Sequence, residues 1–199
     1  MEKLLKELHE YAKENNVPIV LDDTKEKLEK IVKDNNFKET LEIGTAIGYS
    51  GLLILKNSNC NLTTIEKDIV RFDIAKKSFD LAGVTSRVTQ ILGDAVDYIY
   101  STSKKFDFIF LDGPKGQYYK WLPFLKNMLN ENGVLLADNV LFKGMVKKEG
   151  LVKHKNRTIV LSLRSFIKDL ETDNNFDTSL FECGDGIIIA KKMSKNKQN

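Results

Sequence analysis

The sequence predicts an α/β protein in which helices cover both faces of a mostly parallel sheet. Short apolar runs alternate with segments of helical periodicity between residues 38 and 137, and such alternation is typical of a parallel sheet. The first apolar run leads into a glycine-punctuated turn at residues 44–48, and two runs near the carboxyl terminus resemble a closing hairpin. Ligands of parallel sheets bind at the carboxyl ends of the strands, so functional residues are expected there.

Two helices are predicted before the first strand. Residues 2–16 carry apolar side chains on one helical face, as an amphipathic helix that packs on a core does. Residues 17–20, Val-Pro-Ile-Val, interrupt this pattern. Asp22 or Asp23 is expected to cap the second helix, which should end near Asn35 and Asn36.

The remaining elements follow from the same patterns. Strands are predicted at residues 38–43, 62–66, 87–92, 106–111 and 133–137, with helices at 50–56, 68–82, 95–102 and 117–130. A lysine-rich loop then precedes a helix at 158–171, and strands at 176–181 and 186–190 form the hairpin. We expect one domain over 1–199, with amino-terminal helices over 1–36, the sheet core over 37–192 and a polar tail over 193–199.

Composition restricts the class of protein. The chain has 199 residues, a hydrophobic content of 42% and a net charge of +3, which suits one well-filled core and does not by itself indicate nucleic-acid binding. Cys60 and Cys183 lack metal-ligand spacing, and the amino terminus has no apolar run like a signal peptide, so a cytoplasmic protein is expected. His9 and His154 are expected to be solvated, which argues against histidine-based catalysis.

The turn after the first strand predicts a nucleotide site. Gly44 and Gly48 are spaced Gly-x-x-x-Gly, which differs from the dinucleotide and P-loop motifs and favours a smaller adenosine cofactor. Glu66 ends the next strand, where a carboxylate can bind ribose hydroxyls, although it could also be a solvated charge. Asp94 could accept a hydrogen bond from the adenine amino group, and Ala95 leaves room beside the ring.

Two later strand ends predict a metal site. Asp112 follows the strand at 106–111, and Asp138 and Asn139 follow the strand at 133–137. Carboxylate and amide oxygens without sulfur or imidazole select magnesium, calcium or manganese. The alternative is that these aspartates cap the helices that follow.

Lys115 is the candidate general base. It lies three residues after Asp112, and a partly desolvated lysine beside a divalent cation can accept a proton near neutral pH. The alternative is an ordinary surface lysine at the start of a helix.

These segments together resemble a known family. Leu41 to Ser50, Glu66, Gly93-Asp94-Ala95, Asp112-x-x-Lys115 and Asp138-Asn139 are similar to the metal-dependent O-methyltransferases of the catechol and caffeoyl-coenzyme A type. The resemblance implies a Rossmann-like class I fold with a seven-stranded sheet, S-adenosylmethionine (SAM) as methyl donor, Mg²⁺ as metal, and a homodimer. It also implies that Val20 and Ser50 contact the methionine end of SAM, with Asp112 near it.

Within the family, several segments are most similar to a bacterial branch that methylates 5-hydroxyuridine in tRNA: Val17-Pro18-Ile19, Glu42 to Ser50, Lys115-Gly116-Gln117-Tyr118, Asp138 to Gly144 and Gly184-Asp185-Gly186. The resemblance to that branch implies formation of 5-methoxyuridine at the wobble position of the anticodon loop of tRNA.

The lysine-rich loop follows Asn139 and extends to about Lys155. Its basic residues, with one arginine just beyond it, could contact the phosphates of an RNA substrate or be merely solvated. They are Lys143, Lys147, Lys148, Lys153, Lys155 and Arg157.

Three alternatives stay open at this point. The first is an O-methyltransferase for a small catechol-like phenol, which would use the same cofactor, metal and base residues. The second is a non-catalytic protein of the same fold that binds RNA or a partner, and the third is a nucleotide oxidoreductase, which the glycine spacing disfavours. Tyr118 and Trp121 could stack on a base or pack against the sheet.

Overall fold

The computed structural model describes residues 1–148 and 154–194. Its residues divide into two compact units, Met1–Tyr98 and Ile99–Asn199. The seven strands belong to one mostly parallel sheet, with three strands in the first unit and four in the second. This confirms the predicted fold class. The expected single domain over 1–199 stays a prediction, and residues 195–199 of its tail lie outside the described residues.

The first unit contains three parallel strands in the order β3-β2-β1. They are β1 (Glu39–Ile43), β2 (Asn61–Glu66) and β3 (Val88–Leu92). Ile43 pairs with Ile65 in the register of β1 and β2, and Glu66 pairs with Leu92 in that of β2 and β3. The residues that follow these strands therefore lie along one carboxyl edge.

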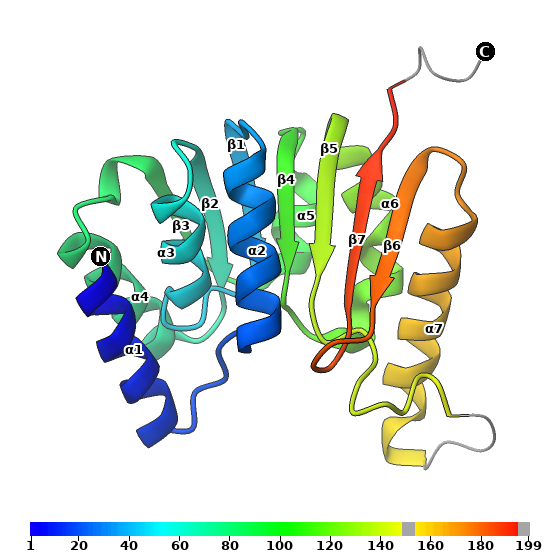
Figure 1. Ribbon diagram of the computed structural model, residues 1–199, viewed down its shortest axis with the longest axis horizontal. Helices are drawn as coiled ribbons and strands as arrows, with labels where there is room; N and C mark the ends of the chain where they lie inside the picture. The colour runs from blue at the N-terminus through cyan, green and yellow to red at the C-terminus, as the bar shows by residue number, and fades with distance from the viewer. Residues whose placement is uncertain (149–153, 195–199) are drawn as a thin grey trace. The chain divides into compact units, whose positions relative to one another are not determined.

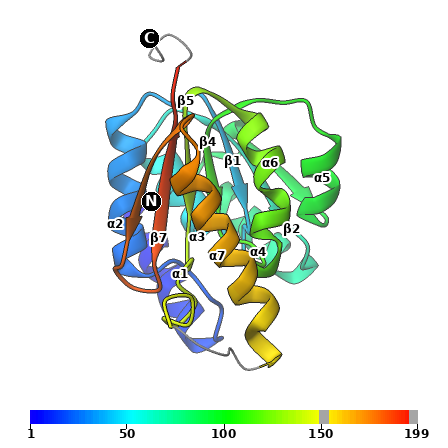
Figure 2. The ribbon, with the colours of Figure 1, turned by 90° about the vertical axis from the view of Figure 1, so that its right-hand side faces the viewer.

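The helices of the first unit are α1 (Glu2–Glu14), α2 (Asp22–Asp34), α3 (Tyr49–Lys56) and α4 (Ile69–Leu81), and α5 (Ala95–Ser101) begins there. Figures 1 and 2 show α2 and α4 on opposite faces of the three strands. The prediction that Asp22 or Asp23 caps α2 is wrong. The N-cap residue is Leu21, whose side chain makes no capping hydrogen bond. Both aspartates lie in the first turn of the helix, where their negative charges interact favourably with the helix dipole.

The second unit contains β4 (Phe106–Leu111), β5 (Leu129–Ala137), β6 (Phe176–Phe181) and β7 (Ile187–Lys192), in the order β4-β5-β7-β6. β4 and β5 are parallel, whereas β7 is antiparallel to both β5 and β6. The predicted hairpin is confirmed. β5 begins four residues before the predicted strand at 133–137, and its register against β4 shifts between Phe106 and Phe108.

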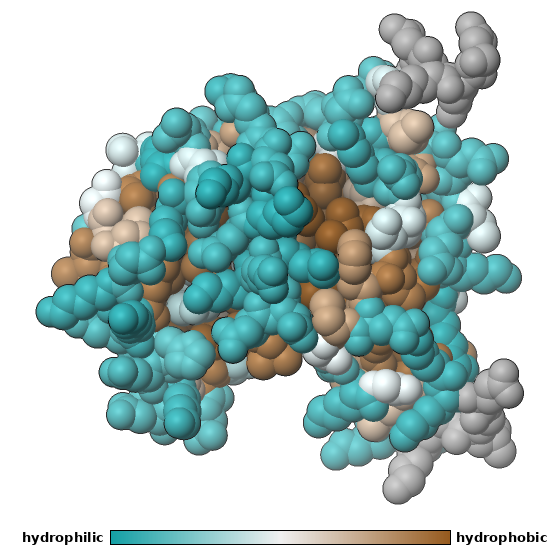
Figure 3. Space-filling view, in the orientation of Figure 1, coloured by the Kyte–Doolittle hydropathy of each residue, from teal (hydrophilic) through white to brown (hydrophobic). Residues whose placement is uncertain are grey.

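Two long helices cover one face of the second unit's strands. They are α6 (Tyr118–Met128) and α7 (Arg157–Thr172), which lie side by side in Figure 2. Lys126 of α6 donates hydrogen bonds to Asp169 and, at 2.8 Å, to Asp173. On the other face of this unit's strands, Figure 3 shows apolar side chains gathered at the surface.

The two cysteines differ in burial, whereas Tyr118 and Trp121 both lie in the core. Cys60 is buried, Cys183 is partly exposed, and both are free thiols. Trp121 and Tyr118 are 1% and 0% exposed, so they pack in the core and the alternative of stacking on a base is wrong. None of the described helices is long and apolar enough to cross a membrane.

Candidate active site

The glycine turn closes against the end of β2. The amides of Gly44 and Thr45 both donate to the carbonyl of Ile65, at 3.1 and 3.2 Å. Gly44 and Gly48 have φ angles of 103° and 86°, which side chains rarely tolerate. Gly48 is also the N-cap of α3. The turn thus leads into the start of a helix, where the helix dipole favours an anionic group.

A buried carboxylate is linked to this turn by hydrogen bonds. Glu42 is fully buried, and its two oxygens accept hydrogen bonds from the hydroxyls of Ser50 and Thr64, each at 2.6 Å. Thr64 is in turn hydrogen-bonded to Thr45. The hydroxyl of Ser50, which the family resemblance assigns to the methionine end of SAM, therefore points to Glu42 in this structure. Sequence reasoning missed Glu42, although an acidic residue inside an apolar strand is the signal that could have found it.

Glu66 is held by backbone amides. Its Oε2 accepts from the N–H of Ala46 at 2.9 Å, and its Oε1 accepts from Lys67 and Asp68 at 3.0 and 2.9 Å. The side chain is 8% exposed, so the alternative of a solvated charge is wrong. The carboxylate joins the glycine turn to the end of β2. Binding of ribose hydroxyls by its remaining lone pairs stays a prediction.

The third strand end adds the residues predicted to contact adenine. The amide of Gly93 donates to the carbonyl of Glu66 at 2.9 Å, which brings this strand end beside β2. Asp94 is exposed and its Oδ1 accepts from the N–H of Val96 at 3.0 Å, so one oxygen supports the start of α5. Ala95 is buried. The first unit thus brings Gly44, Ser50, Glu66, Asp94 and Ala95 to one edge.

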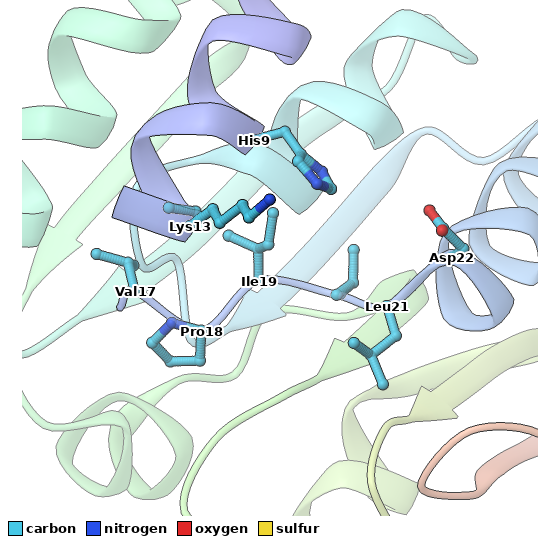
Figure 4. A pocket seen from close by; sticks show the side chains of 9 residues that line it. His9, Lys13, Val17, Pro18, Ile19, Leu21 and Asp22 are labelled. Carbon is cyan, nitrogen blue, oxygen red and sulfur yellow. The ribbon is translucent and has the colours of Figure 1, made fainter. Parts of the chain in front are cut away.

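Val20 lies in the segment between α1 and α2 of the first unit. It is 7% exposed and, with residues of α1, lines the pocket that Figure 4 shows. Its contact with the methionine end of SAM stays a prediction.

The second unit brings the predicted metal ligands to the ends of adjacent strands. Leu111 pairs with Ala137 in the register of β4 and β5, so Asp112 and Asp138 follow side by side. The N–H of Asp138 donates to the carbonyl of Leu111 at 3.1 Å. Asp138 is 2% exposed, and its Oδ1 accepts from the N–H of Asn139 at 2.7 Å. Asn139 has a φ of 54°, a left-handed conformation that asparagine tolerates well.

Lys115 contacts the first of these carboxylates. Its Nζ donates to Oδ1 of Asp112 at 2.6 Å, and the two side chains are 18% and 24% exposed. The Nζ also lies 5.8 Å from the centroid of the Tyr118 ring. Lys115 is therefore partly buried in a defined position, which an ordinary surface lysine would not be.

Tyr118 supports this group of residues. Its hydroxyl donates to the carbonyl of Leu111 at 3.0 Å and lies 3.4 Å from the carbonyl oxygen of Asp138. Burial, followed by the negative charges of Asp112 and Asp138, raises the pKa of Tyr118 well above its ordinary value. The phenol thus stays neutral and connects the ends of β4 and β5. Sequence reasoning considered only stacking or packing for Tyr118.

The donor chemistry of this edge fits a hard divalent cation. Two carboxylates and one amide offer oxygen ligands only, which magnesium accepts while retaining several waters. In residues 1–148 and 154–194, no three His, Cys, Asp or Glu side chains cluster as a metal site, so the amide of Asn139 would have to serve as the third ligand. The residues therefore fit Mg²⁺, and Asp112, which accepts the hydrogen bond of Lys115, would be one of its ligands.

The predicted basic residues after β5 differ in their surroundings. Lys143, Lys147, Lys148, Lys155 and Arg157 are all exposed, and Lys147 also forms an ion pair with Glu182. Lys153 lies outside the described residues. Arg164, which was not predicted, donates to the backbone carbonyls of Val146 and Lys148, at 2.9 and 2.5 Å. The described part of this segment is thus anchored to α7 and presents basic side chains to solvent.

The sheet order and the glycine turn with its acidic strand ends define a class I SAM-dependent methyltransferase. The chain belongs to the O-methyltransferase family, whose model matches residues 1–193. Among curated relatives, it is 27% identical to the caffeoyl-CoA O-methyltransferase of Populus kitakamiensis, with 83% of this chain and 74% of the relative covered. It is 32% identical to the catechol O-methyltransferase of Niastella koreensis over 56% of this chain and 53% of the relative.

Solved structures agree with this membership. A Staphylococcus aureus protein provisionally named a caffeoyl-CoA O-methyltransferase is 31% identical, with a TM-score of 0.85 and coverage of 94% of this chain and 91% of that chain. An O-methyltransferase of Bacillus cereus, solved with S-adenosylhomocysteine, has a TM-score of 0.84 at 23% identity and covers 96% of this chain and 90% of that chain. The latter similarity supports the fold alone.

Proposed function

We propose that this protein transfers the methyl group of SAM to one hydroxyl of a small catechol-like phenol, with Mg²⁺ as metal. The observation that carries the proposal is the group formed by Asp112, Lys115, Asp138 and Asn139 at the ends of β4 and β5. A protein that only binds a cofactor has no need for two carboxylates, an amide and a lysine at one strand edge. The names of the catechol and caffeoyl-CoA relatives support a phenolic acceptor.

The reaction exchanges one bond for another. The S–CH₃ bond of the sulfonium breaks, an O–CH₃ bond forms, and S-adenosylhomocysteine leaves. A bound Mg²⁺ would supply Lewis acidity that favours the phenolate of an acceptor with two adjacent oxygens. Lys115 would accept the proton of the reacting hydroxyl, and its hydrogen bond to Asp112 would have to break for it to do so. Gly44, Glu66, Asp94 and Ala95 would position the nucleoside, and Val20, Ser50 and Asp112 the methionine end.

A second candidate acceptor is 5-hydroxyuridine in the anticodon loop of tRNA. Its 5-hydroxyl and 4-carbonyl would present the same pair of adjacent oxygens. The observation that favours it is the exposed basic set at Lys143, Lys148, Lys155 and Arg157, which could contact RNA phosphates.

A cytoplasmic homodimer remains part of the proposal, and analytical ultracentrifugation would test the assembly.

The deciding experiment measures transfer from labelled SAM, with Mg²⁺ or with chelator, to catechol and to tRNA that contains 5-hydroxyuridine. Mg²⁺-dependent labelling of catechol well above that of tRNA is the expected result. Labelling of tRNA at the wobble position, far above that of catechol, would transfer the assignment to the second candidate. Labelling of neither acceptor would contradict both.

A further inference from the structure

The segment that carries the third predicted metal ligand has an unusual backbone. Asn139, Phe142 and Lys143 have φ angles of 54°, 45° and 56°, so three residues other than glycine are left-handed within five positions. Asparagine tolerates this conformation, whereas it is unfavourable for phenylalanine and lysine. Such a backbone persists only where its surroundings determine it. Contacts from outside the segment must therefore hold residues 139–143 in place.

The turn between β6 and β7 supplies these contacts. It lies at the edge of the second unit's strands where β5 ends (Figure 1). The N–H of Val140 donates to the carbonyl of Gly186 at 2.9 Å. The N–H of Leu141 donates to the carbonyl of Asp185 at the same distance. The two residues that follow Asn139 are thus bonded to the turn through their backbones.

One side chain of the turn adds a third bond. Oδ1 of Asp185 accepts a hydrogen bond from the N–H of Lys143. Because Lys143 is one of the left-handed residues, the carboxylate holds the segment where its backbone conformation is unfavourable. Asp185 therefore bonds to the segment twice, through its carbonyl at Leu141 and through its carboxylate at Lys143.

Gly186 lets the two stretches of chain come this close. Its φ is 84°, and a Cβ at this position would lie 2.8 Å from Cβ of Leu141 and closer still to its Cγ. Leu141 is buried, so any side chain at position 186 would displace it. The Gly184-Asp185-Gly186 sequence thus places a glycine and a hydrogen-bond acceptor against the segment after β5.

We propose that Asp185 is a positioning residue for the metal site. Its bonds to Leu141 and Lys143 hold the backbone at Asn139 in the conformation from which the amide of Asn139 serves as the third ligand. The inference rests on the proposed function, because it takes Mg²⁺ to bind at Asp112, Asp138 and Asn139. Asp185 acts through Asn139 and is not itself a ligand.

Asn139 needs this support more than Asp138 does. Asp138 is fixed by the sheet, since its N–H donates to the carbonyl of Leu111 at 3.1 Å. Asn139 is the first residue beyond that bond. Its N–H donates to Oδ1 of Asp138, and its carbonyl accepts from the N–H of Phe142 at 3.3 Å. A ligand held in place beforehand loses less conformational entropy on binding, so loss of the Asp185 carboxylate should lower metal affinity.

The test is a calorimetric titration of Mg²⁺ with S-adenosylhomocysteine present and no acceptor, so the readout does not depend on turnover. Asp185→Ala removes the acceptor for the N–H of Lys143, and Mg²⁺ affinity should fall by about tenfold. Asp185→Asn keeps an oxygen that can accept from the same N–H, so its affinity should stay within about twofold of the wild type. An ionic strength of about 0.15 M limits long-range effects of the lost charge.

Two further variants separate positioning from other effects. Glu182→Ala removes a carboxylate next to the same turn, whose partner is the side chain of Lys147, and should leave Mg²⁺ affinity unchanged. Gly186→Ala should weaken Mg²⁺ binding at least as much as Asp185→Ala, because its Cβ would displace Leu141. Urea unfolding with chelator present checks that each variant is folded. A purely structural role of Asp185 would lower stability and leave the Mg²⁺ affinity of the folded protein unchanged.

The outcomes distinguish this inference from the proposed function. Wild-type Mg²⁺ affinity in Asp185→Ala or Gly186→Ala, or a loss in Asp185→Asn or Glu182→Ala equal to that in Asp185→Ala, would overturn the positioning role whether or not catechols are methylated. If only Asp185→Ala and Gly186→Ala lose affinity but the wild type methylates no catechol, the positioning role stands and the proposed acceptor fails. Absence of saturable Mg²⁺ binding by the wild type would overturn both.

Discussion

Lys115 donates a hydrogen bond to Asp112 at 2.6 Å, so the predicted base is paired with a predicted metal ligand. Both residues follow β4, and Asp138 at the end of β5 completes the pair of carboxylates. A cation at Asp112 and the ammonium of Lys115 would compete for the same negative charge. Metal binding should therefore weaken the hydrogen bond between Asp112 and Lys115. The amine of Lys115 would then be available to act as the base only when the metal site is occupied.

The first prediction concerns Lys115→Ala. Methyl transfer should fall by about 10² to 10⁴, because a positioned general base contributes rate factors of this size. Mg²⁺ affinity should stay the same or rise, because the competing ammonium is gone. Labelled transfer and a calorimetric Mg²⁺ titration measure the two effects. Lys120→Ala, an exposed lysine of α6, should change neither. Full transfer by Lys115→Ala would exclude Lys115 as the base.

The second prediction concerns Asp138→Asn. The carboxylate is 2% exposed and adjacent to Asp112 and Asn139, so neutralising it should weaken Mg²⁺ binding by about tenfold or more. Transfer should then require a higher Mg²⁺ concentration, and excess chelator should abolish transfer by the wild type. Asp177→Asn, an exposed carboxylate of β6, serves as the control. An unchanged Mg²⁺ dependence in Asp138→Asn would place the metal elsewhere.

The third prediction concerns Glu66→Gln. The glutamine amide can accept through only one of its two polar atoms, so at least one of the three backbone N–H bonds to Glu66 would be lost. A buried unsatisfied donor costs about 1–3 kcal/mol, and the glycine turn should loosen. Calorimetry should show weaker binding of S-adenosylhomocysteine. Glu131→Gln at an exposed site of β5 should bind it as the wild type does.

Local sequence patterns predicted most of the elements because strand and helix periodicities differ clearly in this chain. The start of β5 was missed for a physical reason. Leu129 at its start is followed by three polar residues, the last of which, Asn132, has a φ of 62°. Only the pairing of Leu129 with the distant Phe106 makes them part of the strand. No local pattern contains this pairing.

The sequence predicts at which strand ends the site residues lie, but it does not predict how their side chains are oriented. Strand ends on a parallel sheet converge by geometry, which is why the residues of each unit lie together. The hydrogen-bond partners of individual side chains depend on packing, which no local pattern contains. Ser50 donates to Glu42, Glu66 accepts from backbone amides, and Lys115 donates to Asp112.

The last prediction uses the ion pair between α6 and the end of α7. Asp173 is partly desolvated, which by itself raises its pKa, but hydrogen bonds from Lys126 and Asn175 outweigh burial and leave the pKa below its ordinary value. A group with a lowered pKa in the folded state stabilises the fold above its unfolded pKa, near 3.8, and loses that contribution as the pH falls through the folded pKa. Asp173→Asn should therefore lower the free energy of unfolding at pH 7 by about 1 kcal/mol.

The difference between the wild type and Asp173→Asn should narrow as the pH falls below about 4, because the wild-type carboxylate then becomes neutral. Urea unfolding at pH 7, 5, 4 and 3 measures this difference. Asp73→Asn, an exposed residue of α4, should match the wild type at every pH. If the difference in the free energy of unfolding stays constant down to pH 3, the charge of Asp173 is not what stabilises the fold. Its hydrogen bonds from Asn175 would then be the cause.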